Sequence, residues 1–192
     1  PSAYALSRYA FFGRQIIDTM LELPMIVSPV ALGALVLIFF NTPVGGFLQE
    51  NGIQVVFTVY GILLAQFITT VGIATRLIKA AMDEIPARYE DAAKTLGASP
   101  AMAFLTITLP LSRQGIIAST ILTWAKALGE FGATITVAGS MAMKTETLPV
   151  AIFMRLANAD IAGTAVLVLI LIGIGLGLLY GVRMCTQRQS YV

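Results

Sequence analysis

Apolar segments long enough to cross a membrane recur along the chain and alternate with shorter polar ones. They predict four transmembrane helices, at residues 23–40, 53–76, 112–139 and 161–183, because a helix crosses a bilayer in about 20 residues. The first segment has Pro24 at its entry and Pro29 inside it, which predicts a kink or a break. Residues 1–12 begin with a largely apolar stretch that leads to Arg8. They are interpreted as the end of a truncated helix, with a start on a surface loop as the alternative.

The third segment is unusual because Lys126 and Glu130 lie inside it, one helical turn apart. Charges within a membrane helix cost about 2.5–3.5 kcal/mol each on insertion scales, so they normally face a bundle interior or water. Two interpretations stay open, an ion pair that only neutralises itself and a part of a pathway or gate.

In the fourth segment Gly173, Gly177 and Gly181 recur every four residues. This spacing permits close helix packing, although glycine is common in membrane helices generally.

Composition points to the same class of protein. Of the 192 residues, 57% are hydrophobic and 11% are charged, whereas soluble domains carry about 25% charged residues. The predicted fold class is therefore an all-α membrane protein, a polytopic bundle of transmembrane helices that forms one domain over residues 1–192. The net charge of +2 and the scattered charges argue against binding of nucleic acid.

The residue types present also limit the chemistry. A single cysteine excludes an internal disulfide framework, and the absence of histidine argues against a zinc or haem site, so no metal is expected. The sequence shows no nucleotide-binding motif and no nucleophile–base pair. The chain is therefore not expected to be an enzyme or to bind a cofactor itself.

Basic residues fall mostly on one side of the four predicted spans. Nine of them share that side if every span crosses: Arg8, Arg14, Arg76, Lys79, Arg88, Lys94, Arg113, Arg183 and Arg188. The opposite side has only Lys144 and Arg155. Because cytoplasmic loops carry an excess of lysine and arginine, the side with nine is predicted to be cytoplasmic. The polar segment 84–109, between the second and third spans, then lies in the cytoplasm.

This polar segment has clear helix boundaries. Residues 87–96 favour a helix, with acidic residues early and Lys94 late, and Gly97 suits the position just after its end. Ser99 and Pro100 fit the cap and the first residue of a second helix that ends at Pro110. Two short helices that meet at Gly97 would form a rigid projection on the cytoplasmic face. The alternative is an interfacial helix–turn–helix with no partner.

The segment resembles the transmembrane subunits of ATP-binding-cassette (ABC) importers. The family pattern is Glu-Ala-Ala, three residues, Gly, nine residues, then Ile-x-Leu-Pro, and this chain has Asp91-Ala92-Ala93, Gly97, Ile107 and Leu109-Pro110 at that spacing. The one departure is Asp91 in place of glutamate, with Glu90 just before it, so it is open which acid makes the family's contact. The resemblance assigns coupling to an ATPase to these positions: Glu90, Asp91, Ala92, Ala93, Gly97, Ile107, Leu109 and Pro110.

Other segments resemble the molybdate-type permeases within that family. They are Ala127–Thr134, Val137–Gly139 and Thr145–Pro149. Sulfate permeases tend to carry Tyr-Gly-Ser where this chain has Phe131-Gly132-Ala133, which favours molybdate or tungstate over sulfate or thiosulfate.

The resemblance implies the type I importer permease fold and a set of partners. These are a dimer of cytoplasmic ATPase subunits that hold ATP and Mg²⁺, a second copy of this permease, an extracytoplasmic substrate-binding protein and the lipid of a prokaryotic cytoplasmic membrane. The implied lining of the translocation pathway is Gln66, Lys126, Glu130, Thr134 and Thr136. An ion-gradient-driven transporter and a membrane scaffold protein remain as alternatives from other classes.

Overall fold

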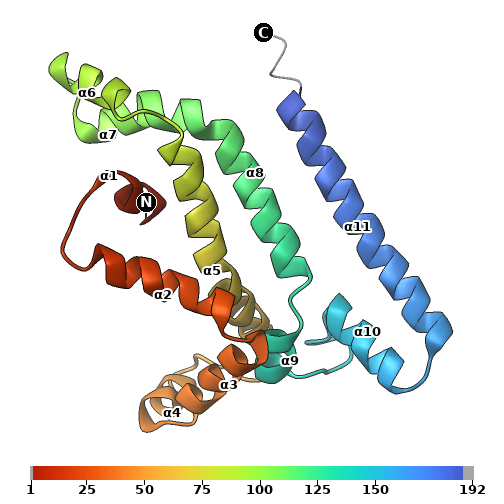
Figure 1. Ribbon diagram of the computed structural model, residues 1–192. Helices are drawn as coiled ribbons and strands as arrows, with labels where there is room; N and C mark the ends of the chain where they lie inside the picture. Colours follow the sequence, from red (N-terminus) through yellow and green to blue (C-terminus); the bar gives the residue numbers. More distant parts are fainter. Residues whose placement is uncertain (1, 188–192) are drawn as a thin grey trace.

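The computed structural model describes residues 2–187, and every regular element in that range is a helix (Figure 1). The elements are α1 (Ser2–Arg8), α2 (Arg14–Ile26), α3 (Pro29–Phe40), α4 (Pro43–Glu50), α5 (Val59–Asp83), α6 (Arg88–Thr95), α7 (Pro100–Ala103), the π-helical turn η1 (Phe104–Thr108), α8 (Leu109–Leu128), α9 (Gly132–Ala138), α10 (Leu148–Ala157) and α11 (Ile161–Gln187). Pro1 of the predicted first segment and Arg188 of the predicted cytoplasmic side lie outside the described residues.

Three stretches of helix in the described range are long and apolar enough to cross a membrane. They are α5, the stretch Pro100–Leu128 made of α7, η1 and α8, and Ile161–Gly181 within α11. A fourth is present if α2 and α3 together form one broken span. Relative to the predicted segment 53–76, α5 starts six residues later and continues seven residues further.

The predicted first span, 23–40, is not one continuous helix. It is divided between α2 and α3, and the chain bends by 112° from one helix to the other. Proline restricts the residue before it to extended conformations, and Ser28, just before Pro29, is extended with φ −62° and ψ 143°. The Ser28 hydroxyl then accepts a hydrogen bond from the Ala31 N–H at 3.2 Å and caps α3. The break therefore lies at Pro29, while Pro24 is accommodated inside α2.

The predicted third span, 112–139, is also divided, and its start differs from the prediction. Helix α8 ends at Leu128, and a short connection leads to α9. At the other end, Pro110 does not end the second helix of the polar segment. In η1 the Leu109 N–H bonds to the Phe104 carbonyl, five residues back. Because a proline ring collides with the carbonyl four residues back, the wider π turn lets the helix continue through Pro110.

Small residues allow the helix backbones to approach closely. A Cβ added to Gly72 of α5 would lie 1.9 Å from the backbone carbonyl oxygen of Leu21 in α2. A Cβ on Gly33 of α3 would meet Thr136 Cβ of α9 at 2.8 Å, so α3 rests directly on α9. The buried core lies at this junction of α3, α5 and α9, and its members are Phe40, Val55, Ala65, Ala133 and Val137.

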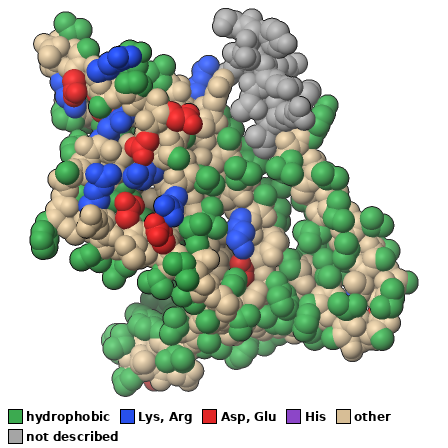
Figure 2. All heavy atoms as spheres, in the orientation of Figure 1, with side chains coloured by type: hydrophobic (Ala, Val, Ile, Leu, Met, Phe, Trp, Pro, Cys, Tyr) green, Lys and Arg blue, Asp and Glu red, His purple; other side chains and the backbone are tan. Residues whose placement is uncertain are grey.

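Charged side chains gather on one end of the molecule. Figure 2 shows lysine, arginine and acidic side chains over α1, α5 and α6, while the lower and right-hand parts of this face are largely hydrophobic. This distribution is what a chain needs if one end lies in water and the remainder lies in lipid.

Helix α11 contacts α8 and α10, but none of its residues within Ile161–Gly181 is buried. A Cβ added to Gly173, Gly177 or Gly181 would meet no atom within 4 Å. The predicted packing face of α11 is therefore not used within the described part of the chain.

Candidate functional site

The polar segment 84–109 forms a projecting pair of helices, α6 and α7, at the charged end (Figures 1 and 2). Gly97 joins them with φ +91°, a left-handed conformation that side chains rarely adopt. The Ala98 N–H bonds to the Ala93 carbonyl and the Gly97 N–H to the Lys94 carbonyl, both at 3.0 Å. These two bonds form a Schellman motif, which ends α6. The Ser99 hydroxyl accepts from the Met102 N–H at 3.2 Å and caps α7.

The exposed face of this pair contains four of the predicted coupling residues. Asp91 has 66% of its side chain exposed and forms an ion pair with Lys94 at 3.0 Å. Ala92, Ala93 and Gly97 are also exposed or partly exposed on the pair. Outside the pair, Ile107 of η1 is partly exposed, and Leu109 and Pro110 are exposed at the start of α8. Sequence reasoning missed Leu96, which is 89% exposed, and Met102, which is 58% exposed. Large apolar side chains exposed at a water-facing end commonly mark a protein interface.

Glu90 behaves differently, since it is only 1% exposed. Its Oε1 accepts from Arg8 Nε at 2.7 Å and from the Thr108 hydroxyl, and its Oε2 accepts from the Tyr4 hydroxyl at 2.8 Å. The carboxylate is thus fully occupied inside the chain. The sequence left open which of the two acids makes the family's contact. In this structure Glu90 lies beneath the surface, and Asp91 is the acid on the outer face.

The electrostatics of Glu90 match this arrangement. Burial by itself would raise the pKa of Glu90, but hydrogen bonds from Thr108, Tyr4 and Arg8, together with the Arg8 charge, hold that pKa below its ordinary value. The carboxylate therefore stays ionised at neutral pH. Arg8 also donates to the backbone carbonyls of Met82, at 3.2 Å, and Ile85, at 2.8 Å. No local sequence signal indicated Arg8 as a partner, since it lies 82 positions before Glu90.

The predicted pathway residues do not form an open channel within the chain. Lys126 Nζ lies 3.6 Å from Glu130 Oε2, and Lys126 is 47% exposed while Glu130 is nearly fully buried. Glu130 Oε1 accepts from the Ala133 N–H at 3.1 Å and caps α9. Thr134 is fully buried, and its hydroxyl has no hydrogen-bond partner among the described residues. Of Lys126, Glu130 and Thr134, Lys126 is therefore the one that another molecule can reach.

The two remaining residues of the predicted pathway, Thr136 and Gln66, lie on different helices, α9 and α5. The Thr136 hydroxyl donates to the Gly132 carbonyl at 2.7 Å, and its Cβ lies against Gly33 of α3. Gln66 lies in the middle of α5 and is partly exposed. The structure therefore groups Glu130, Thr134 and Thr136 around α9, and Gln66 lies apart from them in the sequence and on a different helix.

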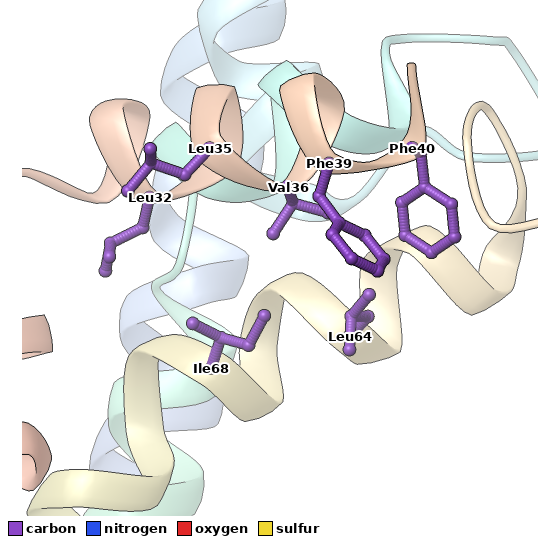
Figure 3. A pocket seen from close by; sticks show the side chains of 7 residues that line it. All are labelled: Leu32, Leu35, Val36, Phe39, Phe40, Leu64 and Ile68. Carbon is purple, nitrogen blue, oxygen red and sulfur yellow. The ribbon is translucent and has the colours of Figure 1, made fainter. Parts of the chain in front are cut away.

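Two of the grooves between helices have linings that are apolar or that contain hydroxyl groups bonded to their own helix. One of about 490 Å³ lies between α3 and α5 (Figure 3), and only apolar side chains line it: Leu32, Leu35, Val36, Phe39, Phe40, Leu64 and Ile68. Another of about 360 Å³, between α5 and α8, is lined in part by Thr70, Thr120 and Thr123. Each of these hydroxyls donates to a carbonyl of its own helix. Within residues 2–187, no group of three or more histidine, cysteine or acidic side chains could hold a metal ion.

Known proteins place the chain in a family. Residues 2–190 match the family described as the binding-protein-dependent transport system inner membrane component. The chain is 32% identical over 188 residues to the sulfate transport system permease protein CysT of Salmonella typhimurium, an alignment that covers 97% of this chain and 68% of that protein. It is 38% identical over 154 residues to the molybdenum transport system permease protein ModB of Haemophilus influenzae, with 79% of this chain and 67% of that protein covered.

A solved structure shows the same fold. A bacterial ABC transporter involved in the import of the acidic polysaccharide alginate aligns with a TM-score of 0.69 at 16% sequence identity, over 97% of this chain and 70% of the other. The predicted all-α permease fold is therefore confirmed. Membership of this family also means that the chain is a permease subunit, which is not itself an enzyme and binds no cofactor.

Family membership further implies two kinds of partner, an ATPase and a substrate-binding protein. The chain spans about two thirds of the length of the two curated relatives. It belongs to the inner membrane components of binding-protein-dependent transport systems, as a multi-pass permease of the bacterial inner membrane in the sulfate and molybdate group of ABC oxyanion importers.

Proposed function

We propose that this permease carries molybdate or tungstate and that its ATPase docks on the exposed face of α6 and α7. The observation that supports the docking surface is the rigid turn at Gly97, with Asp91 and Ala92 outside it and Glu90 locked beneath it. Leu96 and Met102 add apolar area to the same projection.

The long helical stretch that follows the projection supports the same proposal. From Pro100 the chain continues as one helix through η1 to Leu128, a length of about 40 Å at 1.5 Å per residue. The proposed docking surface therefore lies at one end of this stretch, beside α7 (Figure 1), and Lys126 lies in the last turn of α8 at the other end. When ATP draws two ATPase subunits together, two such helices in a pair of permease copies would rock as rigid bodies and alternate the access of the anion site.

The choice of molybdate or tungstate is supported by Phe131-Gly132-Ala133 and by the 38% identity to the ModB permease. Sulfate is the competing candidate, because the CysT permease aligns over nearly all of this chain. The test is ATP-driven uptake by the complete complex in proteoliposomes with its binding protein. We expect excess tungstate to block uptake of labelled molybdate while excess sulfate leaves it unchanged. Efficient block by sulfate, or uptake driven by an ion gradient without ATP, would refute the proposal.

Lys126 is proposed to face the anion pathway, since a half-exposed cation at membrane depth needs water or an anion nearby. We expect Lys126→Gln to slow uptake about tenfold, equivalent to roughly 1.4 kcal/mol of barrier. Two effects add up, because the variant loses the attractive charge and leaves Glu130 to repel the anion. The fold should survive, since the Ala133 N–H still binds the Glu130 carboxylate.

The matched controls for this prediction are Lys126→Arg, which keeps the charge, and Lys144→Gln, which removes an exposed charge outside the predicted spans. Both should transport at close to the normal rate. If Lys126→Gln also transports normally at equal membrane levels, the ion pair has only a structural role.

A further inference from the structure

The buried carboxylate of Glu90 joins three separate elements. Tyr4 and Arg8 reach it from α1, Thr108 reaches it from η1, and Glu90 itself belongs to α6. Both oxygens are in use, and Glu90 and Thr108 are among the most completely buried side chains of the described chain. We call these four residues, Tyr4, Arg8, Glu90 and Thr108, the Glu90 clamp.

Helix α1 is tied to the end of α5 as well. Arg8 donates to the carbonyls of Met82 and Ile85, and the Ser7 hydroxyl donates to Asp83 Oδ1 at 2.6 Å. Because Met82 lies in the last turn of α5 and Ile85 lies in the connection from α5 to α6, Arg8 holds this connection as well as the buried face of α6. The charged end of the molecule is thus cross-linked through α1.

Helix α6 has little intrinsic stability of its own. It has only eight residues, and its N-cap Ala87 offers no side-chain hydrogen bond. Isolated helices of this length are marginal in water, and short turns at both ends connect α6 to its neighbours. Without the Glu90 clamp, a force on the outer face of α6 would tilt this short helix about its two connections and would not move α1 and η1 with it.

We propose that the Glu90 clamp makes α1, α6 and η1 one moving body, so that the ATPase drives α1 together with the long helix. This inference rests on the proposed docking of the ATPase on α6. It assigns Glu90 and Arg8 as positioning residues that transmit movement without touching the ATPase. Helix α1, which lies far from α6 in sequence, becomes part of the coupling machinery.

The first test uses Glu90→Gln in the complete complex with its ATPase and binding protein. Glutamine keeps the size and one acceptor oxygen but removes the charge that holds Arg8. We expect the ATPase to co-purify and to hydrolyse ATP within about twofold of the normal rate, while anion uptake per ATP falls at least tenfold. A purely structural role would lower ATPase association, hydrolysis and uptake together, in proportion to the folded protein. That proportional loss would overturn the inference.

The matched control is Ser7→Ala, which removes a hydrogen bond between α1 and α5 but leaves all four clamp residues in place. Its uptake per ATP should stay normal. Asp91→Lys separates this inference from the proposed function, because Asp91 lies on the outer face. If Asp91→Lys leaves ATPase association intact, the docking proposal fails; if it abolishes association while Glu90→Gln keeps full coupling, only the clamp proposal fails.

A second test needs no change in the clamp. Spin labels at Ser2→Cys on α1 and Thr95→Cys on α6, both exposed positions, report the distance between these helices in a Cys185→Ser background. We expect the same narrow distance distribution without nucleotide and with trapped ATP, and a broadened one when Arg8→Met is added. A distance that shifts on ATP binding in the otherwise unchanged chain would show that α1 and α6 move separately, and would refute the proposal.

Discussion

Gly97→Val is expected to reduce uptake at least tenfold while the chain still inserts into the membrane. Gly97 has φ +91°, and a side chain in the left-handed region costs roughly 1–2 kcal/mol, more for a β-branched residue. A Cβ at this position would meet no atom of the chain within 4 Å. We therefore expect the loss of uptake to arise from the altered turn and from its contact with the ATPase proposed to dock there, and uptake at equal membrane levels measures it.

The matched control is Gly13→Val. Gly13 has nearly the same φ, +89°, and its Cβ would also meet nothing within 4 Å, but it lies outside the α6–α7 projection. Gly13→Val should carry a comparable strain and retain most of the uptake. If both variants lose transport equally, backbone strain alone explains the loss. If Gly97→Val transports normally, the turn has no coupling role.

Gly72→Ala is expected to be the most destabilising single methyl addition in the described chain. Its Cβ would lie 1.9 Å from the Leu21 carbonyl oxygen and 3.0 Å from the Leu21 carbonyl carbon, and backbone atoms cannot move aside as a flexible side chain can. Helices α2 and α5 must separate, and the Arg76–Glu22 ion pair between them, at 3.0 Å, must rearrange. Overpacking typically costs about 1–3 kcal/mol, and we expect the upper end or more. The measurement is the thermal unfolding midpoint in detergent.

Gly173→Ala provides the matched control for this prediction. Gly173 is also a helical glycine, but no atom lies within 4 Å of its added Cβ. Alanine favours a helix over glycine by up to about 1 kcal/mol, so the isolated chain should unfold at the same or a slightly higher temperature. A destabilisation as large as that of Gly72→Ala would contradict the packing argument. Loss of dimer with an unchanged midpoint would instead place the second permease copy on α11.

Local signals in the sequence determined much of the proposed docking surface. The turn at Gly97 and the Ser99 cap match the sequence prediction because each depends only on nearby residues. The turn depends on the backbone angle φ of Gly97, and the cap depends on a hydrogen bond to a residue three positions away. The apolar segments likewise agree in position with α5 and α11, since burial in lipid acts on a continuous stretch of one helix. The spacing from Asp91 to Pro110 was sufficient to indicate the family, which the comparisons confirmed.

Helix continuity was harder to predict. Pro29 and Pro110 have the same covalent restriction, yet α2 and α3 separate at the first, while η1 carries the helix through the second. The difference is decided by what the displaced backbone groups can bond to. Ser28 offers a cap for a new helix, and the Phe104 carbonyl offers an acceptor for a wider turn. A hydrophobic pattern contains no information about these partners.

The roles of the two adjacent acids were decided only by the tertiary structure. Glu90 and Asp91 have equal charge and neighbouring positions, so the sequence left their roles open. Folding brings Tyr4 and Arg8 from α1 onto Glu90, across more than 80 residues of chain, and leaves Asp91 exposed beside Lys94. The sequence by itself determined which segment forms the charged pair of short helices between two apolar spans, because hydrophobicity and helix capping are local. Which of its acids faces outward depends on long-range contacts, and these exist only once the helices have packed.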